Sequence, residues 1–318
     1  MGTINKANIK QMINIIKASF INPSVMIIEL TNDCNADCVM CIREHLSQEP
    51  TYMDTELFKK IINQAKTLDI KVFQLSFFGE PLLVHDFGEK LSYIKEKIPG
   101  AVVVTRTNAS LLSPEVALDL MKRGIDSINV SIDGNNKSEF EAIRKGLHYV
   151  NVERNIQSIS KLRNAGNFDT SISISTLHTK DYPIDETKFR RKWTPWVDSI
   201  FISEEHDIRI TKREGLLNKL VPCNNLLTQF LIRANGNVSQ CLFDWLGNTF
   251  MGNVNDQSIY SIWHSPKFRL YRLINIFGLK KVFLYCRYCN RRFVRNSFCK
   301  PAILFKRKQQ SWVKFPKI

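Results

Sequence analysis

Residues 25–41 read Val-Met-Ile-Ile-Glu-Leu-Thr-Asn-Asp-Cys-Asn-Ala-Asp-Cys-Val-Met-Cys, so an apolar strand leads directly into Cys34, Cys38 and Cys41. Three thiolates on one short loop can hold three corners of a cubane 4Fe–4S cluster, and the fourth iron is then open to a small molecule. A metal site built only for structure would be fully ligated. The spacing therefore favours an open cluster that takes part in chemistry.

Three other interpretations of these cysteines stay open: a zinc knuckle with His45 as the nearest spare ligand, a disulfide pair, and three unrelated buried thiols. Lysines interrupt the apolar stretch in the first 24 residues, which lacks the layout of a signal peptide. The sequence also holds no run of eighteen uncharged apolar residues. We therefore expect a cytoplasmic, reducing location, where disulfides are rare.

The composition of the 318 residues fits a globular protein, since 44% hydrophobic residues can bury a large core. Its net charge of +15 is uneven, because residues 257–318 hold 15 Lys and Arg and no acidic residue. We expect this end to face something anionic: a phosphorylated substrate, a membrane surface or nucleic acid. A solvated basic face is the alternative.

Strand and helix signals alternate through the first two thirds of the chain. Asp54 is expected to cap a helix from about Thr55 to Leu68, and Ser113-Pro114 to begin another that ends at Gly124. The apolar spacing from Val152 to Leu162 predicts a third helix, closed by Gly166. Strands are expected at 25–30, 70–76, 101–105, 125–133, 171–177 and 199–203.

This alternation predicts an α/β fold, a partial (β/α)6 TIM-like barrel with a parallel sheet. Chemistry in such barrels gathers at the carboxyl ends of the strands, where the cysteine loop falls. After residue 205, Asn235-Gly236 indicates a β-hairpin within 230–242, and a basic amphipathic stretch covers 268–284. A small second domain is therefore expected.

A second group of cysteines, Cys223, Cys241, Cys286 and Cys289, lies in this C-terminal part. Four thiolates would close a metal site completely, and zinc and a 4Fe–4S cluster both fit that number. Cys299 is left over, more simply a lone thiol than a ligand.

At this point the chain resembles the radical S-adenosylmethionine (SAM) enzymes, whose signature is C-x3-C-x2-C after a first strand. Phe78-Gly-Glu-Pro resembles the family's Gly-Gly-Glu-Pro, and Thr107-Asn-Ala its Thr-Asn-Gly; each has lost a glycine. Ser131-Ile-Asp-Gly resembles the family's segment after the fourth strand, and Arg144 matches the arginine that commonly pairs with the SAM carboxylate. The resemblance implies that Cys34, Cys38 and Cys41 bind a 4Fe–4S cluster. It implies SAM contacts at Phe78, Gly79, Glu80, Asn108, Ser131, Asp133 and Arg144.

The C-terminal segments around Cys223, Cys241 and Gly252-Asn-Val are similar to the SPASM/twitch extension of these enzymes. The resemblance implies that Cys223, Cys241, Cys286 and Cys289 hold an auxiliary 4Fe–4S cluster. We expect a helical lead-in at 1–24, the barrel at 25–205, a linker at 206–222, the SPASM/twitch domain at 223–299 and a basic aromatic tail at 300–318.

The activity that the resemblance implies is reductive cleavage of SAM to a 5′-deoxyadenosyl radical, which takes a hydrogen atom from the substrate. A fully ligated auxiliary cluster suits removal of an electron, so we expect a two-electron oxidation by a radical SAM oxidoreductase. A sugar or polyol, anionic or lipid-linked, is the favoured substrate. A peptide-modifying maturase and a non-enzymatic zinc-binding adaptor are the alternatives.

Partners follow from the same considerations. The resemblance implies an electron donor such as flavodoxin or ferredoxin. Aromatic and basic residues mixed in 300–318 suit peripheral contact with the inner face of a membrane, or else a tail that is disordered or packed on the barrel. No specific nucleic acid is expected. The catalytic base is unknown; Asp244 is a weak candidate and more simply a turn residue.

Iron analysis after anaerobic reconstitution tests the two cysteine groups. We expect about eight irons per chain, falling to about four when Cys34, Cys38 and Cys41 are all replaced by Ala, because each group holds one four-iron cluster. Zinc in both groups, without iron, would instead favour the adaptor interpretation.

Overall fold

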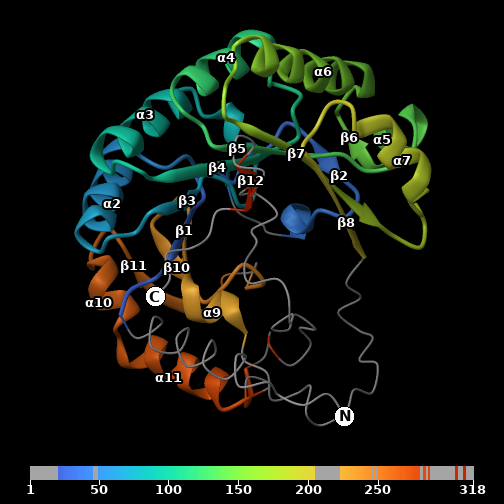
Figure 1. Cartoon of the computed structure of the whole chain (residues 1–318). Helices are drawn as coiled ribbons and strands as arrows, with labels where there is room; N and C mark the ends of the chain where they lie inside the picture. The colour runs from blue at the N-terminus through green and yellow to red at the C-terminus, as the bar shows by residue number, and fades with distance from the viewer. Residues whose placement is uncertain are drawn as a thin grey trace.

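A nine-stranded sheet in the order β11-β10-β9-β1-β3-β4-β5-β7-β8 forms the centre of the protein (Figure 1). The computed structural model describes residues 21–45, 49–204, 223–244, 247, 249–279, 282–283, 286, 305–306 and 311–312. The strands are β1 (Val25–Ile28), β3 (Val72–Gln74), β4 (Val102–Thr107), β5 (Ser127–Ser131), β7 (Ser171–His178), β8 (Ser199–Glu204), β9 (Gln229–Ile232), β10 (Asn237–Ser239) and β11 (Phe250–Asn253).

The six strands from β1 to β8 pair in parallel, each with its neighbour in the sheet. All six lie within or close to the ranges expected from the sequence. The helices that alternate with them cover one face of the sheet, with α2, α3, α4 and α6 along its outside (Figure 1). The fold is therefore the predicted α/β arrangement of a partial barrel.

The described helices of the barrel part are α2 (Thr55–Thr67), α3 (Phe87–Lys97), α4 (Pro114–Lys122), α5 (Lys137–Ile143), α6 (Tyr149–Ala165) and α7 (Glu186–Trp193). The expected starts are confirmed: Asp54 accepts hydrogen bonds from two backbone N–H groups of α2, and Ser113 accepts one from Val116. Helices α3, α5 and α7 were not located from sequence. In α7 the charged residues outnumber the apolar ones, and only Phe189 and Trp193 are buried.

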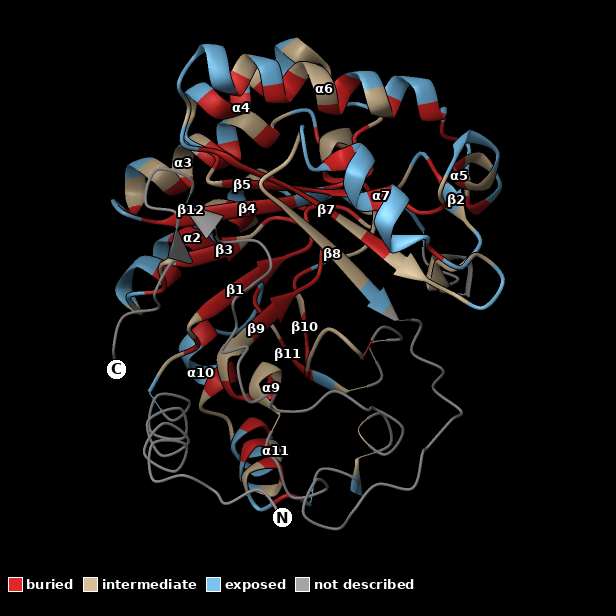
Figure 2. Ribbon diagram, turned by 45° about the vertical axis from the view of Figure 1, so that its right-hand side comes forward, coloured by how far each residue is buried: buried red, intermediate tan, exposed pale blue. Residues whose placement is uncertain are grey.

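Apolar side chains form two clusters, one on each side of the sheet. The larger cluster lies between the strands and the helices, and includes Phe58 of α2 and Leu91 of α3. The smaller cluster holds only strand residues, Val25, Ile27, Val72, Val102, Val104 and Leu231, with Phe77 and Leu242 packed on it. Because side chains alternate along a strand, the smaller cluster marks the inner face of the barrel. Figure 2 shows the buried strands beneath helices whose outer faces are exposed.

The C-terminal part continues the sheet of the barrel. Strand β9 pairs in parallel with β1, and β10 and β11 follow in antiparallel order. The predicted hairpin turn lies between β9 and β10, where Gly236 has a φ of +86°, a conformation that glycine adopts readily. The helices α9 (Asn224–Thr228), α10 (Ile259–Trp263) and α11 (Pro266–Ile276) complete this part. The sequence predicted the hairpin but not that its first strand would lie beside β1.

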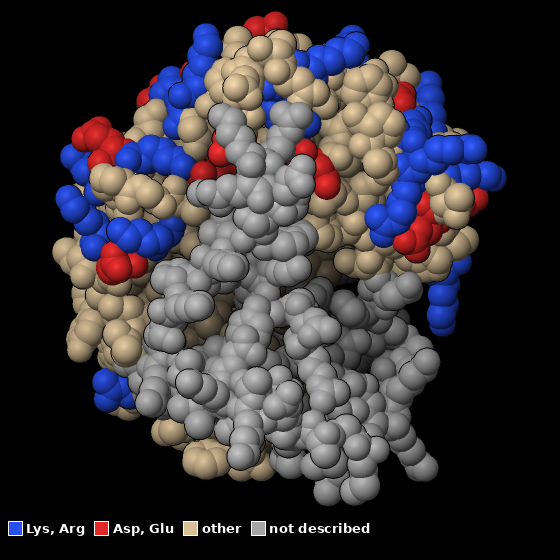
Figure 3. Space-filling view, in the orientation of Figure 1, with Lys and Arg blue, Asp and Glu red and all other residues tan. Residues whose placement is uncertain are grey.

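Several sequence expectations fall on residues that are not described: most of the lead-in at 1–24, the linker at 206–222, Cys289, Cys299 and most of the tail at 300–318. In the tail, β12 (Phe305–Lys306) and β13 (Ser311–Trp312) pair in antiparallel order. Within the described part of the chain, no helix is both long and apolar enough to cross a membrane. Lys and Arg alternate with Asp and Glu over the barrel helices on the face in Figure 3.

The joint sheet predicts a stability effect at Phe230 in β9. Its ring is fully buried between β9 and the rings of Trp263 and Phe268, with centroids 6.1 and 6.2 Å away. Phe230→Ala should lower the free energy of unfolding by about 3–5 kcal/mol, because it leaves a cavity in the core. Urea denaturation followed by circular dichroism measures this.

Leu270→Ala on α11 is the matched control, since Leu270 is 53% exposed and should change stability by less than about 0.5 kcal/mol. Equal effects of the two substitutions would show that Phe230 is not part of a shared core.

Candidate functional site

The cysteine loop lies where the carboxyl ends of the parallel strands meet. It follows β1 directly, and the ends of β3, β4 and β5 carry the other residues that the sequence singled out. Cys34, Cys38 and Cys41 are half-buried, and none of the three is in a disulfide. The structure thus places the predicted site residues of the barrel at one edge of the sheet.

A small two-stranded sheet connects this loop to the predicted arginine. Strand β2 (Asp37–Cys38) pairs in antiparallel order with β6 (Arg144–Lys145), and Cys38 lies opposite Arg144. The loop turns tightly afterwards, because the Cys41 N–H donates to the Cys38 carbonyl at 2.8 Å. The backbone therefore fixes Arg144 beside the cysteines.

Two arginines, Arg43 and Arg144, lie near the cysteine thiols, and so do the acidic side chains of Glu80 and Asp133. The Arg144 Nη1 atom lies 3.8 Å from the Cys38 sulfur, while its Nη2 atom pairs with Asp133 Oδ2 at 2.6 Å. Burial raises the pKa of the Cys34 thiol to about 11 and also raises that of Cys38, whereas Arg43 lowers both and Arg144 lowers that of Cys38. Thiols must lose their protons to bind metal, and the nearby guanidinium groups favour the thiolate.

These thiols fit an iron–sulfur cluster. Cys34, Cys38 and Cys41 are free thiols on one loop, and each can bind metal once it has lost its proton. A cubane cluster binds each thiolate through a different iron, so its ligands stand further apart than those of one zinc ion. Three unbridged thiols with two arginines nearby are thus suited to an anionic cluster.

The turn after β3 packs against the cysteine loop at Gly79. Its φ is +73°, and a Cβ atom there would lie 2.4 Å from the Asp33 carbonyl oxygen and 2.5 Å from that of Thr31. The neighbouring Glu80 N–H donates to the Asp33 carbonyl at 2.7 Å. The glycine is therefore required by a close approach of two backbones. Phe78 keeps a negative φ, so a side chain is tolerated where the family has its first glycine.

The Glu80 carboxylate connects the ends of β3 and β4. It is buried and accepts hydrogen bonds from Thr107 Oγ1 at 2.6 Å and from the Asn108 N–H at 2.7 Å. Burial raises the pKa of Glu80, and these hydrogen bonds oppose that rise. The side chain of Glu80 is thus held by hydrogen bonds within the protein.

Asn108 connects the end of β4 to the cysteine loop, because its Nδ2 donates to Asn35 Oδ1 at 2.9 Å. The next residue, Ala109, has a φ of +60°. An alanine here therefore keeps the left-handed conformation of the family's glycine, at a cost of about 1–2 kcal/mol. Alanine is therefore compatible with the left-handed backbone of this turn.

Ser131 and Asp133 come from the end of β5. Asp133 is buried and accepts a hydrogen bond from the Leu177 N–H at 2.7 Å through its other oxygen, Oδ1. Asp133 thereby holds the Arg144 guanidinium through Nη2, while Nη1 lies beside the Cys38 sulfur. Ser131 ends β5, where it is half-buried and paired with Ser175 of β7.

The C-terminal cysteines also come together. Cys223 immediately precedes α9, Cys241 follows β10, and Cys286 lies beside Gln240, whose Nε2 is 3.4 Å from its sulfur. Burial raises the pKa of Cys241, and the charges of Cys223 and Cys286 raise it further. Three of the four predicted ligands are therefore neighbours, which fits a second cluster. The fourth, Cys289, is not described.

Asn275 and Asp244 support this second group. Asn275 exchanges two hydrogen bonds with the backbone of Cys223, at 2.8 and 2.9 Å. Asp244 is fully buried, and its Oδ2 accepts a hydrogen bond from the Thr249 N–H at 3.0 Å. The structure thus uses Asp244 within the turn after Cys241, as the simpler sequence interpretation had it.

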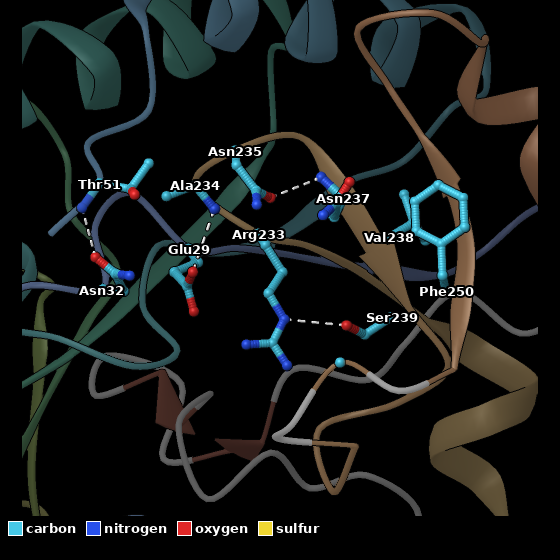
Figure 4. A pocket seen from close by; sticks show the side chains of 11 residues that line it. Glu29, Asn32, Thr51, Arg233, Ala234, Asn235, Asn237, Val238, Ser239 and Phe250 are labelled. Atoms are coloured by element: carbon cyan, nitrogen blue, oxygen red, sulfur yellow. Dashed lines mark hydrogen bonds between the residues drawn. The ribbon is translucent and has the colours of Figure 1, made fainter. Parts of the chain in front are cut away.

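A polar cavity of about 80 Å³ lies between the end of β1 and the β9–β10 hairpin (Figure 4). Glu29 and Arg233 line it, together with Asn32, Thr51 and Ser239. Burial raises the pKa of Glu29 to about 7 even though Arg233 lowers it. Sequence analysis missed both residues. One sequence signal could have revealed Glu29. It follows Val25 and Ile27 at intervals of two, so a charged side chain is expected on the same inner face as these apolar ones.

Comparisons with known proteins agree with this geometry. The family model of the radical SAM superfamily matches residues 28–187. The model of the iron-sulfur cluster-binding domain called SPASM matches residues 223–290.

Among curated proteins, the S-adenosyl-L-methionine-dependent 2-deoxy-scyllo-inosamine dehydrogenase of Niallia circulans is 22% identical over 86% of this chain and 95% of its own length. The mycofactocin maturase MftC of Mycolicibacterium smegmatis is 29% identical, over 50% of this chain and 39% of its own.

Two solved structures share the fold. That of BtrN in complex with AdoMet and 2-DOIA has a TM-score of 0.56 and 22% identity, and the match covers 84% of this chain and 93% of BtrN. Native anSMEcpe with bound AdoMet has a TM-score of 0.63 and 17% identity, over 79% of this chain and 83% of that protein.

Gly79→Ala should disturb the first cysteine group alone, because its new Cβ would push against the Thr31 and Asp33 carbonyls. We expect iron after reconstitution to fall from about eight to about four per chain. Gly100→Ala is the control, since Gly100 has a similar φ of +80° but nothing within 4 Å of an added Cβ. Full iron content in Gly79→Ala would contradict a close contact with the cluster loop.

Proposed function

Because this chain belongs to the radical SAM superfamily and carries a C-terminal SPASM domain, we propose that it oxidises an alcohol carbon of a sugar or cyclitol to a carbonyl. The observation that carries this proposal is the similarity to a 2-deoxy-scyllo-inosamine dehydrogenase along nearly the full length of both proteins. The substrate of that relative is a ring that bears hydroxyl groups. A hydroxyl-bearing ring is accordingly the substrate class we propose for this chain.

The residues of the barrel mouth support the binding of a cluster and SAM. Cys34, Cys38 and Cys41 would hold the first 4Fe–4S cluster, with Arg144 beside them. When bound, the reduced cluster and SAM supply a radical that removes a hydrogen atom from an unactivated carbon. The proposed SAM contacts surround the same edge of the sheet: Phe78, Gly79, Glu80, Asn108, Ser131, Asp133 and Arg144.

Glu80 and Asp133 would position other SAM-binding groups rather than contact SAM with their own side chains. Glu80 holds the turns after β3 and β4 together, and Asp133 fixes the Arg144 guanidinium. Their side chains therefore position the groups that would contact SAM. A guanidinium can bind a carboxylate through two parallel hydrogen bonds, which suits Arg144 to the methionine end of SAM.

The second cysteine group supports an oxidation. Cys223, Cys241 and Cys286 are neighbours, and with Cys289 they would ligate an auxiliary 4Fe–4S cluster fully. A fully ligated cluster suits electron transfer better than substrate binding. This arrangement favours a net loss of two electrons from the substrate over a rearrangement.

Finer assignments of substrate and partners are part of the same proposal. Arg106 and Arg233 follow Val104 and Leu231 on the inner face of the barrel, which favours a substrate with an anionic group. Flavodoxin or ferredoxin is the proposed electron donor. Peripheral membrane contact through residues 300–318 rests on their composition alone.

Product analysis under anaerobic conditions tests the oxidation. The reconstituted protein, SAM and a chemical reductant are incubated with aminocyclitols, free sugars, sugar phosphates and nucleotide sugars in separate reactions. We expect one class to yield 5′-deoxyadenosine together with a carbonyl product that has lost two hydrogen atoms, both measured by mass spectrometry.

The Cys34/Cys38/Cys41→Ala protein is the control and should form neither product. A precursor-peptide library run in parallel tests the alternative. Modification of a peptide, with no oxidation of any sugar or cyclitol, would replace this proposal by a maturase.

A further inference from the structure

Oxidation of an alcohol to a carbonyl leaves one proton for the protein to accept. The carbon gives up a hydrogen atom to the SAM-derived radical, one electron goes to an iron–sulfur acceptor, and the hydroxyl proton goes to a base. Together these losses equal two hydrogen atoms, so the C–O bond becomes C=O and the equation balances. The base must lie within hydrogen-bond reach of the hydroxyl group.

Glu29 is placed to meet this need because two parallel strands converge on it. Ile28 of β1 pairs with Ile232 of β9, and the Glu29 N–H donates to the Ile232 carbonyl at 2.9 Å. Glu29 and Arg233 therefore follow adjacent strands side by side. Glu29 lies two residues after Ile27, and Arg233 lies two residues after Leu231. Because side chains alternate along a strand, both side chains lie on the inner face of the barrel.

One oxygen of the Glu29 carboxyl group accepts a hydrogen bond, and the other is buried beside the cavity without one. Oε1 accepts a hydrogen bond from the Ala234 N–H at 3.2 Å. Oε2 is buried and has no hydrogen-bond partner, and the side chain of Glu29 lines the cavity (Figure 4). A buried carboxyl oxygen without a partner is costly, so a ligand group or water is expected to occupy this position.

Arg233 supplies a fixed positive charge to the same cavity. Its Nε donates to Ser239 Oγ at 3.0 Å and its Nη2 to the Asp244 carbonyl at 2.7 Å. The guanidinium carbon also lies 5.2 and 5.5 Å from the ring centroids of Phe77 and Phe78. These contacts hold the charge in place near Glu29 rather than in contact with solvent.

The cavity joins the two halves of the proposed chemistry. Asn32 and Thr51 line it on the side of the cysteine loop, and Arg233 and Ser239 line it on the side of the hairpin. Phe78, in the turn proposed to hold SAM, is close enough for its N–H to lower the pKa of Glu29. Cys241 follows Ser239 by two residues. A substrate in this cavity would lie between both cysteine groups.

We propose that Glu29 is the catalytic base that takes the proton from the substrate hydroxyl group, and that Arg233 orients the substrate in the cavity beside it. This inference rests on the proposed function. It assigns the proton acceptor that sequence analysis left unknown.

The charge state of Glu29 gives the proposal a pH dependence. Burial raises the pKa of Glu29 to about 7, and this rise is opposed by Arg233, which directly follows β9, and by the N–H groups of Ala234 and Phe78. Below this pKa the carboxyl group is protonated and cannot accept a proton. The yield of carbonyl product per 5′-deoxyadenosine should therefore rise as the pH increases through about 7.

Glu29→Gln tests the role, because glutamine preserves the shape of the side chain but cannot take the proton. We expect 5′-deoxyadenosine formation to persist while carbonyl product per 5′-deoxyadenosine falls about a hundredfold. Glu29→Asp keeps a carboxylate and should recover part of the yield. Infrared difference spectra of the cluster-free protein, wild type minus Glu29→Gln, should show a carboxyl band that titrates near pH 7.

The outcomes separate this inference from the proposed function. If the wild type oxidises no alcohol at all, the proposed function fails. If the wild type oxidises its substrate and Glu29→Gln gives the same ratio of products, Glu29 is not the base. Should Glu29→Gln fail to fold by circular dichroism, a pH-independent ratio in the wild type would overturn the proposal, and a ratio rising through about 7 would support it.

Discussion

The parallel pairing of β9 with β1 is the contact on which the rest of the site depends. Strand β1 is the one strand in the described sheet that pairs with both the barrel, through β3, and the C-terminal hairpin, through β9. Its carboxyl end leads into the cysteine loop, and its last inward-facing position is Glu29. The same pairing sets Arg233 beside Glu29, and β10 then runs antiparallel to β9, so that Cys241 follows it towards the amino end of β1. Hydrogen bonds from Lys60 to the Asn255 carbonyl and from the Ile259 N–H to Gln64 add to this connection between the two parts.

Much of this arrangement could be predicted because local signals and the global fold agree. The caps Asp54 and Ser113, the turn at Gly236 and the apolar strands each favour the structure that forms. The cysteine spacing pointed to the correct edge of the sheet. Pairing of β9 with β1 could not be predicted in the same way, since the two strands are separated by about two hundred residues. The cavity was missed for the same reason: its lining comes from both.

The two lost family glycines show which backbone constraints are strict. Ala109 still takes a left-handed conformation, and Phe78 needs no unusual φ at all. Gly79 differs from both, because the space for a Cβ is already filled by the carbonyls of Thr31 and Asp33. Of these three positions, glycine is sterically required only at Gly79, where two backbones touch. Elsewhere, the sequence can depart from the pattern while the turn and its hydrogen bonds to Glu80 and Asn35 persist.

The shared sheet also determines whether the barrel and the SPASM domain can be separated from each other. All four residues of β1 are buried, and their backbone groups on one side bond only to β9. A chain that stopped before β9 would expose an apolar, unpaired strand edge, which is a template for aggregation. The barrel and the SPASM domain, although matched by separate family models, are therefore expected to be inseparable in practice. Replacing the SPASM domain with that of a relative would also replace β9, the strand that pairs with β1. We therefore expect relatives to differ by changes in their loops rather than by exchange of whole domains.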